Sequence, residues 1–196
     1  MQIREVFDRK RFVFLDGGMG TQLQARGLQP GQKPELAALE MPDVLTAIHT
    51  DYANAGADIL LANTFGANAK KLAGCGHTVE DVVTASIACA RKAADTTGAL
   101  VALDIGPLGE LLVPAGTLSF EDAYAEFAQV IRAGAAAGAD LVFLETMTDL
   151  YELKAAILAA KENCILPVLT SMSFESRGRT FTGCTVESYA VTAAGL

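Results

Sequence analysis

The sequence predicts an α/β fold made of repeated strand–helix units, and three observations lead to this prediction. The 196 residues are 51% hydrophobic and 19% charged, which supplies a large core and excludes an intrinsically disordered chain. The 34 alanines and 18 glycines, with no tryptophan, favour close packing of helices on a sheet over an all-β sandwich. The strand-like runs are apolar on both faces, which is typical of a parallel sheet covered by helices.

An internal repeat gives the length of one unit. The segments Ala55-Gly-Ala-Asp58 and Ala137-Gly-Ala-Asp140 each precede a short apolar run, and these runs end in Asn63-Thr64 and Glu145-Thr146. The two copies lie 82 residues apart, and one further strand-like run falls between them. Each strand–helix unit therefore takes about 41 residues.

Five strands are expected, at residues 12–16, 59–62, 100–104, 141–144 and 166–170. The helices between them have recognisable starts. These starts are Pro42-Asp43, Thr78-x-x-Asp81, Ser119-x-x-Asp122, Asp149-x-x-Glu152 (which resembles a capping box) and the region near Thr185.

Units of this length favour a (β/α)8 TIM barrel over an open doubly wound sheet, which commonly has shorter units and a G-x-G-x-x-G motif after its first strand. A complete barrel takes roughly 250 residues. We therefore interpret residues 1–196 as the N-terminal part of one barrel domain, incomplete, with about five βα units. Its open edges predict self-association. Side chains expected to face its interior include Val13, Leu15, Leu60, Val101, Leu103, Val142, Leu144 and Val168.

Charge and composition exclude several classes of partner. Fifteen Lys and Arg against 23 Asp and Glu give a net charge of −8, which argues against nucleic acid. No apolar run approaches 18 residues, and the charged N-terminus lacks the apolar stretch of a secretory signal, so no membrane contact is expected. Four sparse cysteines fit a reducing, cytoplasmic location.

Polar residues stand at the ends of the expected strands, where parallel α/β folds place their chemistry. They are Asp16, Asn63, Asp104, Glu145 and Ser171. Three carboxylates and an amide that converge on one rim would suit a zwitterionic ligand with an amino group.

The glycine-rich loop after the first strand is a second candidate binding element. Gly17, Gly18 and Thr21 lie in a stretch whose backbone N–H groups can hold an anion. A phosphate site would add Lys or Arg, and none occurs between this loop and Arg26, so a carboxylate fits better.

The cysteines and histidines do not have the spacing of metal ligands. Cys75, Cys89, Cys164 and Cys184 form no C-x2-C pair, and there is no H-E-x-x-H motif. We expect structural roles for the cysteines, and solvated or capping roles for the two histidines, His49 and His77.

Several stretches resemble the homocysteine S-methyltransferase family. They are Leu15-Asp-Gly-Gly-Met-Gly-Thr21, Ala55-Gly-Ala-Asp58 with Asn63-Thr-Phe-Gly-Ala67, Asp104-Ile-Gly-Pro-Leu-Gly109, Glu145-Thr-Met-x-Asp149-Leu-x-Glu152, and Met172-Ser-Phe174 with Gly178-Arg-Thr-x-x-Gly183. They cover essentially the whole chain, in order and at suitable spacing. The blocks that begin at Asp104 and Glu145 most resemble the N-terminal homocysteine-binding module of cobalamin-dependent methionine synthases.

The resemblance implies a (β/α)8 barrel that binds homocysteine at the carboxyl ends of its strands. Glu145 would hold the substrate ammonium, and Asp16 with the amides after it would hold the amino-acid end. No catalytic residue is assigned within this chain. The substrate-binding set that we expect is Asp16, Gly17, Gly18, Thr21, Asn63, Asp104, Glu145 and Ser171.

The resemblance also implies zinc, which activates the homocysteine thiol in this family. Three cysteines hold it, one in a G-x-N-C strand and two in a G-G-C-C-G-T segment, and both segments would follow the position of Leu196. No cysteine among these 196 residues matches them. We therefore expect no complete zinc or cobalamin site here, and no activity from the chain alone.

The expected function is that of a fragment of a methyltransferase that makes methionine from homocysteine. The methyl group would come from methylcobalamin charged by 5-methyltetrahydrofolate, bound by folate- and cobalamin-binding modules in the same or a partner chain. Betaine or S-methylmethionine as donor, or a non-catalytic half-barrel binding module, are the alternatives. An aldolase-type enzyme is disfavoured because no Lys stands at a strand end.

Overall fold

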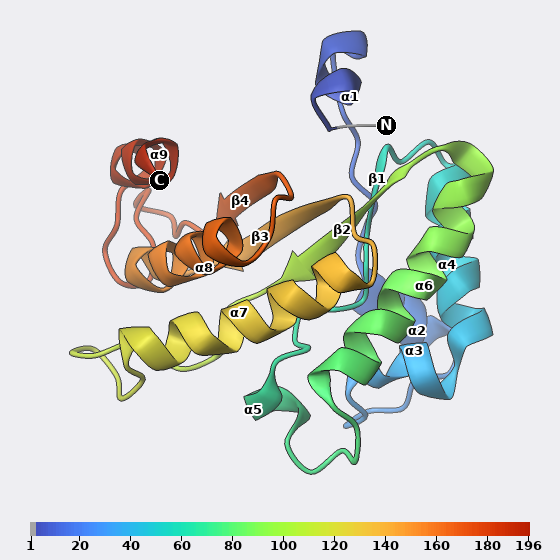
Figure 1. Ribbon diagram of the computed structural model, residues 1–196, viewed down its shortest axis with the longest axis horizontal. Coiled ribbons are helices and arrows are strands. Elements are labelled where there is room, and N and C mark those ends of the chain that lie inside the picture. Colours follow the sequence, from blue (N-terminus) through green and yellow to red (C-terminus); the bar gives the residue numbers. More distant parts are fainter. Residues whose placement is uncertain (1–2) are drawn as a thin grey trace.

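A computed structural model describes residues 3–196 and shows one parallel sheet covered by helices. The four strands are hydrogen-bonded in the order in which they occur along the chain, each parallel to the next (Figure 1). Their bounds are β1 Ile59–Leu61, β2 Leu100–Ile105, β3 Leu141–Met147 and β4 Val168–Met172. The prediction of a parallel α/β fold is confirmed.

The expected first strand, at residues 12–16, is present only as a single parallel bridge between Leu15 and Ile59. Asp58 N and Ile59 N both donate to the carbonyl oxygen of Phe14, and Asp16 N donates to Ile59 O at 3.1 Å. The segment therefore lies beside β1 as expected. The prediction of five full strands is wrong, because the chain leaves the sheet at Gly17, directly after this bridge.

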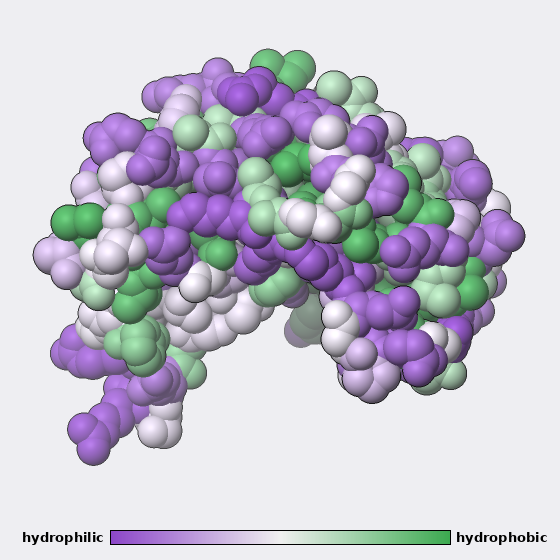
Figure 2. Space-filling model, turned by 90° about the horizontal axis from the view of Figure 1, so that it is seen from below, coloured by the Kyte–Doolittle hydropathy of each residue, from purple (hydrophilic) through white to green (hydrophobic). Residues whose placement is uncertain are grey.

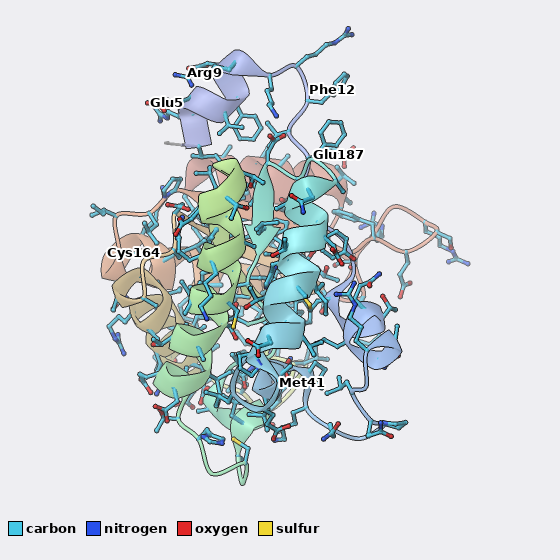
Figure 3. The ribbon with its side chains drawn as sticks, turned by 90° about the vertical axis from the view of Figure 1, so that its right-hand side faces the viewer. Glu5, Arg9, Phe12, Met41, Cys164 and Glu187 are labelled. Carbon is cyan, nitrogen blue, oxygen red and sulfur yellow. The ribbon has the colours of Figure 1, made fainter. Side chains whose placement is uncertain are left out.

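The helices occupy the segments between the strands. Their bounds are α1 Ile3–Arg9, α2 Met19–Ala25, η1 Pro34–Leu36 (a 3₁₀ turn), α3 Ala37–Glu40, α4 Pro42–Asn54, α5 Ala69–Leu72, α6 Val79–Thr97, α7 Phe120–Ala136, α8 Leu150–Asn163 and α9 Val186–Gly195. The long helices α4, α6, α7 and α8 pack on the outer face of the sheet, and α4 runs beside α6 (Figures 1 and 3). No helix within residues 3–196 is long and apolar enough to cross a membrane.

Most of the predicted helix starts are confirmed. Thr78 and Asp81 form a reciprocal capping box at α6, and Ser119 and Thr185 cap α7 and α9. The capping box expected at Asp149 and Glu152 is wrong. Asp149 caps α8 by accepting from Tyr151 N, but the Glu152 side chain points away and accepts from Leu108 N at 2.7 Å.

The outer face of the sheet is the main hydrophobic core. Five side chains that were expected to face a barrel interior are instead fully buried beneath the helices. They are Leu60, Val101, Leu103, Val142 and Leu144, and the partly buried Val168 packs with them. Because side chains alternate along a strand, the opposite face carries the other set, which includes Ile59, Leu100, Ala102 and Leu141. Val13 is the one member of the expected set that packs on that inner face.

The two ends of the sheet differ. At the amino ends of the strands, Ile3 and Val6 of α1 pack on the first residues of β1, β2 and β3. Figure 3 shows Arg9 of α1 at one end of the molecule and Met41, at the start of α4, at the other. The space-filling view shows an arch around a hollow (Figure 2). The amino ends of the strands are therefore the end that α1 covers.

Small residues bring the helices close to the sheet, as the composition predicted. Alanines of α6, α7 and α8 are buried against it. Gly134 of α7 lies so near β2 that a Cβ atom there would come within 2.4 Å of the Leu103 side chain. A larger residue at this position would require either the Leu103 side chain or the helix to shift.

The repeated Ala-Gly-Ala-Asp segments have the same structural role in both copies. Gly56 and Gly138 follow helix ends with φ of 102° and 89°, a conformation that favours glycine. Asp58 then exchanges two hydrogen bonds with Phe14: its N–H donates to Phe14 O at 2.7 Å, and its carboxylate accepts from Phe14 N at 3.0 Å.

Asp140 repeats this exchange one strand pair further along. Its N–H donates to Val101 O at 2.8 Å, and its carboxylate accepts from Val101 N at 2.7 Å. A basic side chain pairs with each aspartate, Lys10 with Asp58 and Arg91 with Asp140. Each repeat therefore joins its own strand to the preceding one at the amino end of the sheet.

We expect Asp140→Ala to lower the free energy of unfolding by about 1–2 kcal/mol, because the Val101 N–H loses its acceptor. Asp140→Asn keeps an acceptor and should recover most of the loss. Denaturant unfolding measures both variants, with Asp95→Ala, at an exposed position of α6, as control. Equal stabilities for Asp140→Ala and the control would contradict the assigned role.

Candidate functional site

A cavity of about 490 Å³ lies at the carboxyl ends of the strands. Its size is in the range of small-molecule sites. Four of the residues at the predicted rim, Asp16, Asn63, Asp104 and Glu145, line it, together with Gly17 and Gly18 of the loop. Thr21 and Ser171 are not part of the lining. The other lining residues are Met19, Gly20, Pro34, Glu35, Leu61, Ala62, Phe65 and Thr146.

Asp16 is fixed by β1. Its side chain is 2% exposed, and Oδ2 accepts from Leu61 N at 3.0 Å. Oδ1 has no hydrogen-bond partner within residues 3–196. Burial raises the pKa of Asp16 from 3.8 to about 7; the bond from Leu61 opposes this rise, and the nearby charge of Glu145 adds to it. Asp16 is therefore a fixed carboxyl group with one oxygen left for a donor.

Asp104 and Glu145 complete an acidic group. Asp104 is buried, with Oδ1 unpartnered among the described residues, and burial raises its pKa well above 3.8, with further contributions from Glu145 and Asp16. Burial also raises the pKa of Glu145. Thr64 holds the backbone here, since its hydroxyl donates to Asp104 O and accepts from Asp104 N.

The backbone beside Glu145 is strained. Thr146 has a φ of 57°, which is rare for a β-branched residue, and the pairing of β3 with β4 is shifted between Leu144 and Met147. Ser171 of β4 supports this turn, because its hydroxyl accepts from Thr146 N at 2.9 Å. The predicted site residue Ser171 thus acts on the neighbour of Glu145 rather than on the cavity. Such distortions concentrate at functional sites.

Asn63 lines the cavity but uses its side-chain amide to hold the cavity wall. Its Nδ2 donates to Pro34 O at 2.6 Å, which fixes η1 over the end of β1. Pro34 and Glu35 of η1 are lining residues that the sequence analysis missed. They lie in a short turn between helices, away from any strand end, and no pattern in the sequence indicated them.

The glycine loop is held from the side of α4. The Tyr52 hydroxyl donates to Gly18 O at 3.2 Å, and a Cβ at Gly17 would lie only 3.0 Å from the Tyr52 ring. Gly17 therefore permits the close approach of Tyr52. The exposed Thr21 donates to Gly18 O at 3.2 Å, within the first turn of α2, and so shapes the loop without lining the cavity.

Phe65 forms an apolar wall that the sequence analysis also missed. Its ring lies directly on Gly106, where a Cβ would come within 2.4 Å of it. Two groups hold the loop after β2 in place: Lys71 donates to Pro107 O at 2.7 Å, and Glu152 accepts from Leu108 N. The Asn63-Thr-Phe-Gly motif was noted in the sequence, but only its first residue was assigned to the site.

The expectation of a solvated or capping role for His49 is wrong. The imidazole is fully buried on α4, and Nδ1 lies 3.9 Å from Asp16 Oδ2. Burial lowers its pKa from 6.5 to about 4, so the ring is neutral at pH 7. His77, by contrast, is exposed in a loop as expected.

The described residues do not form a metal site. Within residues 3–196, no three His, Cys, Asp or Glu side chains are grouped as ligands of one ion. The four cysteines are free thiols on separate elements: Cys89 is buried in α6, and the other three are half-buried. These residues therefore do not form the three-cysteine zinc site that the resemblance implies, and we assign no chemical step to a metal here.

The chain matches a known family over nearly its whole length. The family model described as homocysteine S-methyltransferase matches residues 13–195. Methionine synthase from Mycobacterium tuberculosis is 34% identical over 197 aligned residues, which cover 89% of this chain. The enzyme of the same name from Mycobacterium leprae is 33% identical over the same share. The chain spans only 16% of the length of each.

Solved structures have the same fold. The homocysteine methyltransferase MmuM from Escherichia coli, in its metallated form, matches with a TM-score of 0.85 at 23% identity. Its oxidised form matches with a TM-score of 0.88 at 24% identity. The two matches cover 98% of this chain and 74% and 73% of the MmuM chains.

The buried Glu152 predicts a pH-dependent stability. Burial raises its pKa from 4.5 to about 7, so the folded protein disfavours the charged form and loses stability as the pH rises through this range. Glu152→Gln keeps an oxygen for Leu108 N but cannot ionise. We expect it to exceed the parent stability at pH 8 by about 1–3 kcal/mol and to differ little near pH 4.5. Urea unfolding at the two pH values measures this.

The control is Glu162→Gln, at an exposed position of the same helix. A difference between Glu152→Gln and the parent that is equal at pH 4.5 and pH 8 would show that the ionisation of Glu152 does not affect stability.

Proposed function

The chain belongs to the homocysteine S-methyltransferase family, and from this we propose that its cavity binds the amino-acid end of homocysteine as the methyl acceptor. One observation carries the proposal: among the described residues, those that line the cavity include four carboxyl groups and no Lys, Arg or His. Burial and, to a lesser extent, repulsion between the carboxyl groups raise the pKa values of Asp16 and Asp104, and a cationic group on the ligand would offset both effects.

The ammonium group of an amino acid suits this arrangement. It has three N–H donors, and three of the lining residues are Asp16, Asp104 and Glu145. Asp16 Oδ1 and Asp104 Oδ1 are buried and have no hydrogen-bond partner among the described residues. A buried acceptor without a donor is unfavourable by about 1–3 kcal/mol, so each oxygen gains when a donor arrives. Glu145 and Asp16 would thus hold the ammonium, with Asp104 as a third acceptor.

The remaining predicted residues would shape the rest of the site. We assign the ligand carboxylate to the backbone of Gly17 and Gly18, in the loop held by Thr21 and Tyr52. Phe65 offers an apolar wall for the ligand's methylene groups. In this assignment Asn63 and Ser171 act indirectly, through Pro34 and Thr146.

We also propose that the sheet is part of a (β/α)8 barrel. The support is the match to MmuM, which covers 98% of this chain and about three quarters of the other. On this view the inner face of the sheet faces the barrel interior, and the β4 edge would pair with a further strand. Without that strand, the edge would favour self-association.

For the whole protein we propose methyl transfer from methylcobalamin, recharged by 5-methyltetrahydrofolate, to give methionine. The support for methionine as the product is the 34% identity to a methionine synthase. Zinc and cobalamin would be held by residues outside this chain. The contribution of residues 3–196 is to bind and orient the amino acid.

Removing charge from the cavity should weaken homocysteine binding. We expect Asp16→Asn and Glu145→Gln each to lower the affinity about ten- to a hundredfold, since each loses a charged hydrogen bond worth about 1.5–3 kcal/mol. Calorimetric titration of the full-length protein measures this. Glu80→Gln, exposed in the first turn of α6, is the matched control. Unchanged affinity in both cavity variants would disprove the assignment.

Asp104→Asn should change the stability and the homocysteine affinity in opposite directions. Because burial and two neighbouring carboxyl groups disfavour the Asp104 charge, the neutral side chain should raise the melting temperature at pH 8. Homocysteine affinity should fall at the same pH. A variant that loses stability at pH 8 would show that Asp104 is retained for the fold rather than for the ligand.

A further inference from the structure

The least expected side chain near the cavity is His49, which lies behind Asp16 on the side away from the cavity lining. It has no exposed surface, and neither ring nitrogen has a hydrogen-bond partner within residues 3–196. A buried imidazole without partners is unfavourable by about 1–3 kcal/mol. An apolar residue would stabilise this position better, so the presence of His49 needs another explanation.

The unpartnered atoms occur together. The buried side-chain polar atoms that lack a partner in the described chain belong to Asp16, Asp104, His49 and Thr46. Two of these residues line the cavity, and the other two lie three residues apart on one face of α4. The unpartnered atoms thus belong either to the cavity lining or to the face of α4 that carries Thr46 and His49.

The same helix also contacts the loop that follows Asp16. Tyr52 lies three residues after His49, donates to Gly18 O and packs on Gly17. His49 and Tyr52 therefore back the segment from Asp16 to Gly18. Figure 3 shows that α4 lies beside α6 along its length, which makes it a firm support.

We propose that His49 is a positioning residue for Asp16, with Nδ1–H as a donor that holds the carboxylate from behind while Oδ1 faces the ligand's ammonium group. This inference rests on the proposed function. The 3.9 Å separation of Nδ1 and Oδ2 is longer than a hydrogen bond. A small side-chain rotation closes it when Asp16 is charged, as catalytic and binding contacts tighten on ligand binding.

The role of His49 depends on the groups that favour or oppose the ionisation of Asp16. Burial opposes the ionisation of Asp16, the Leu61 N–H favours it, and the charge of Glu145 on β3 adds to the opposition. Asp16 in turn raises the pKa of Asp104 on β2. Glu35 of η1 lines the same cavity, and α2 carries no charged residue. Asp16 is the one carboxylate within 4 Å of His49 in the described chain. A second N–H donor would make the anion, which binds the ammonium, available at a lower pH.

The test follows the titration of the Asp16 carboxyl carbon by NMR, with Asp16→Asn to assign the signal. In His49→Leu the midpoint should rise by about one pH unit, because a donor to the anion is lost. Homocysteine affinity should then be about fivefold weaker at pH 7 and match the parent near pH 9.5. Thr46→Val removes the other unpartnered group of α4 and should leave the midpoint unchanged.

Two amide variants identify the nitrogen involved. His49→Asn places an N–H donor near the position of Nδ1 and should restore the parent midpoint, whereas His49→Gln places it near Nε2 and should not. These variants also keep the test decisive if His49→Leu does not fold. A parent-like midpoint in a folded His49→Leu, or equal midpoints for the Asn and Gln variants, would overturn the inference.

The carboxyl titration needs no ligand, so the two proposals fail separately. If homocysteine does not bind the parent protein at any pH, the proposed function is wrong, while a shifted Asp16 midpoint still supports the contact with His49. If homocysteine binds but the midpoint does not respond to His49, the function stands and the positioning role is wrong.

Discussion

Side chains of a β-strand alternate between its two faces, and this constraint connects the hydrophobic core to the candidate site. In β2, Leu103 is fully buried under the helices, so Asp104 has to lie on the opposite face. Leu144 and Glu145 have the same relation in β3. A slip of one residue would bring the carboxylates under α7 and expose the leucines. The packing of the outer face therefore decides where the acidic groups point, although neither Leu103 nor Leu144 lines the cavity.

The sequence predicted those features that depend on local patterns. The Ala-Gly-Ala-Asp repeat, the caps at Thr78 and Ser119, and the polar residues at the strand ends could be read directly. The sequence could not show which face of each strand lies under the helices, because runs that are apolar on both sides have no alternation of polar and apolar residues. In β2 only Asp104 marks the inner face. The same limit applies to His49 and Glu152: helical spacing placed them on helices, but their burial depends on packing against Asp16 and Leu108.

The site is the part of the molecule where local preferences conflict with the fold. Asp16 and Asp104 hold buried oxygens that have no partner within residues 3–196, and Thr146 has a left-handed backbone. At the opposite end of the sheet, the Phe14 and Val101 backbone groups are paired in both directions. Conflicts confined to one end of an otherwise consistent structure are typical of a site maintained for binding. The unsatisfied groups thus point to the same end of the sheet as the strand-end pattern in the sequence.

The two repeated aspartates also bear on how the chain folds. Asp58 joins its unit to a residue 44 positions earlier, and Asp140 to one 39 positions earlier. Strands pair in chain order, so every such contact links one unit only to the unit before it. Contacts of this moderate separation require closure of one loop at a time. The chain can therefore assemble progressively from its N-terminus, each new strand adding to an edge that already exists, in the direction in which a ribosome delivers it.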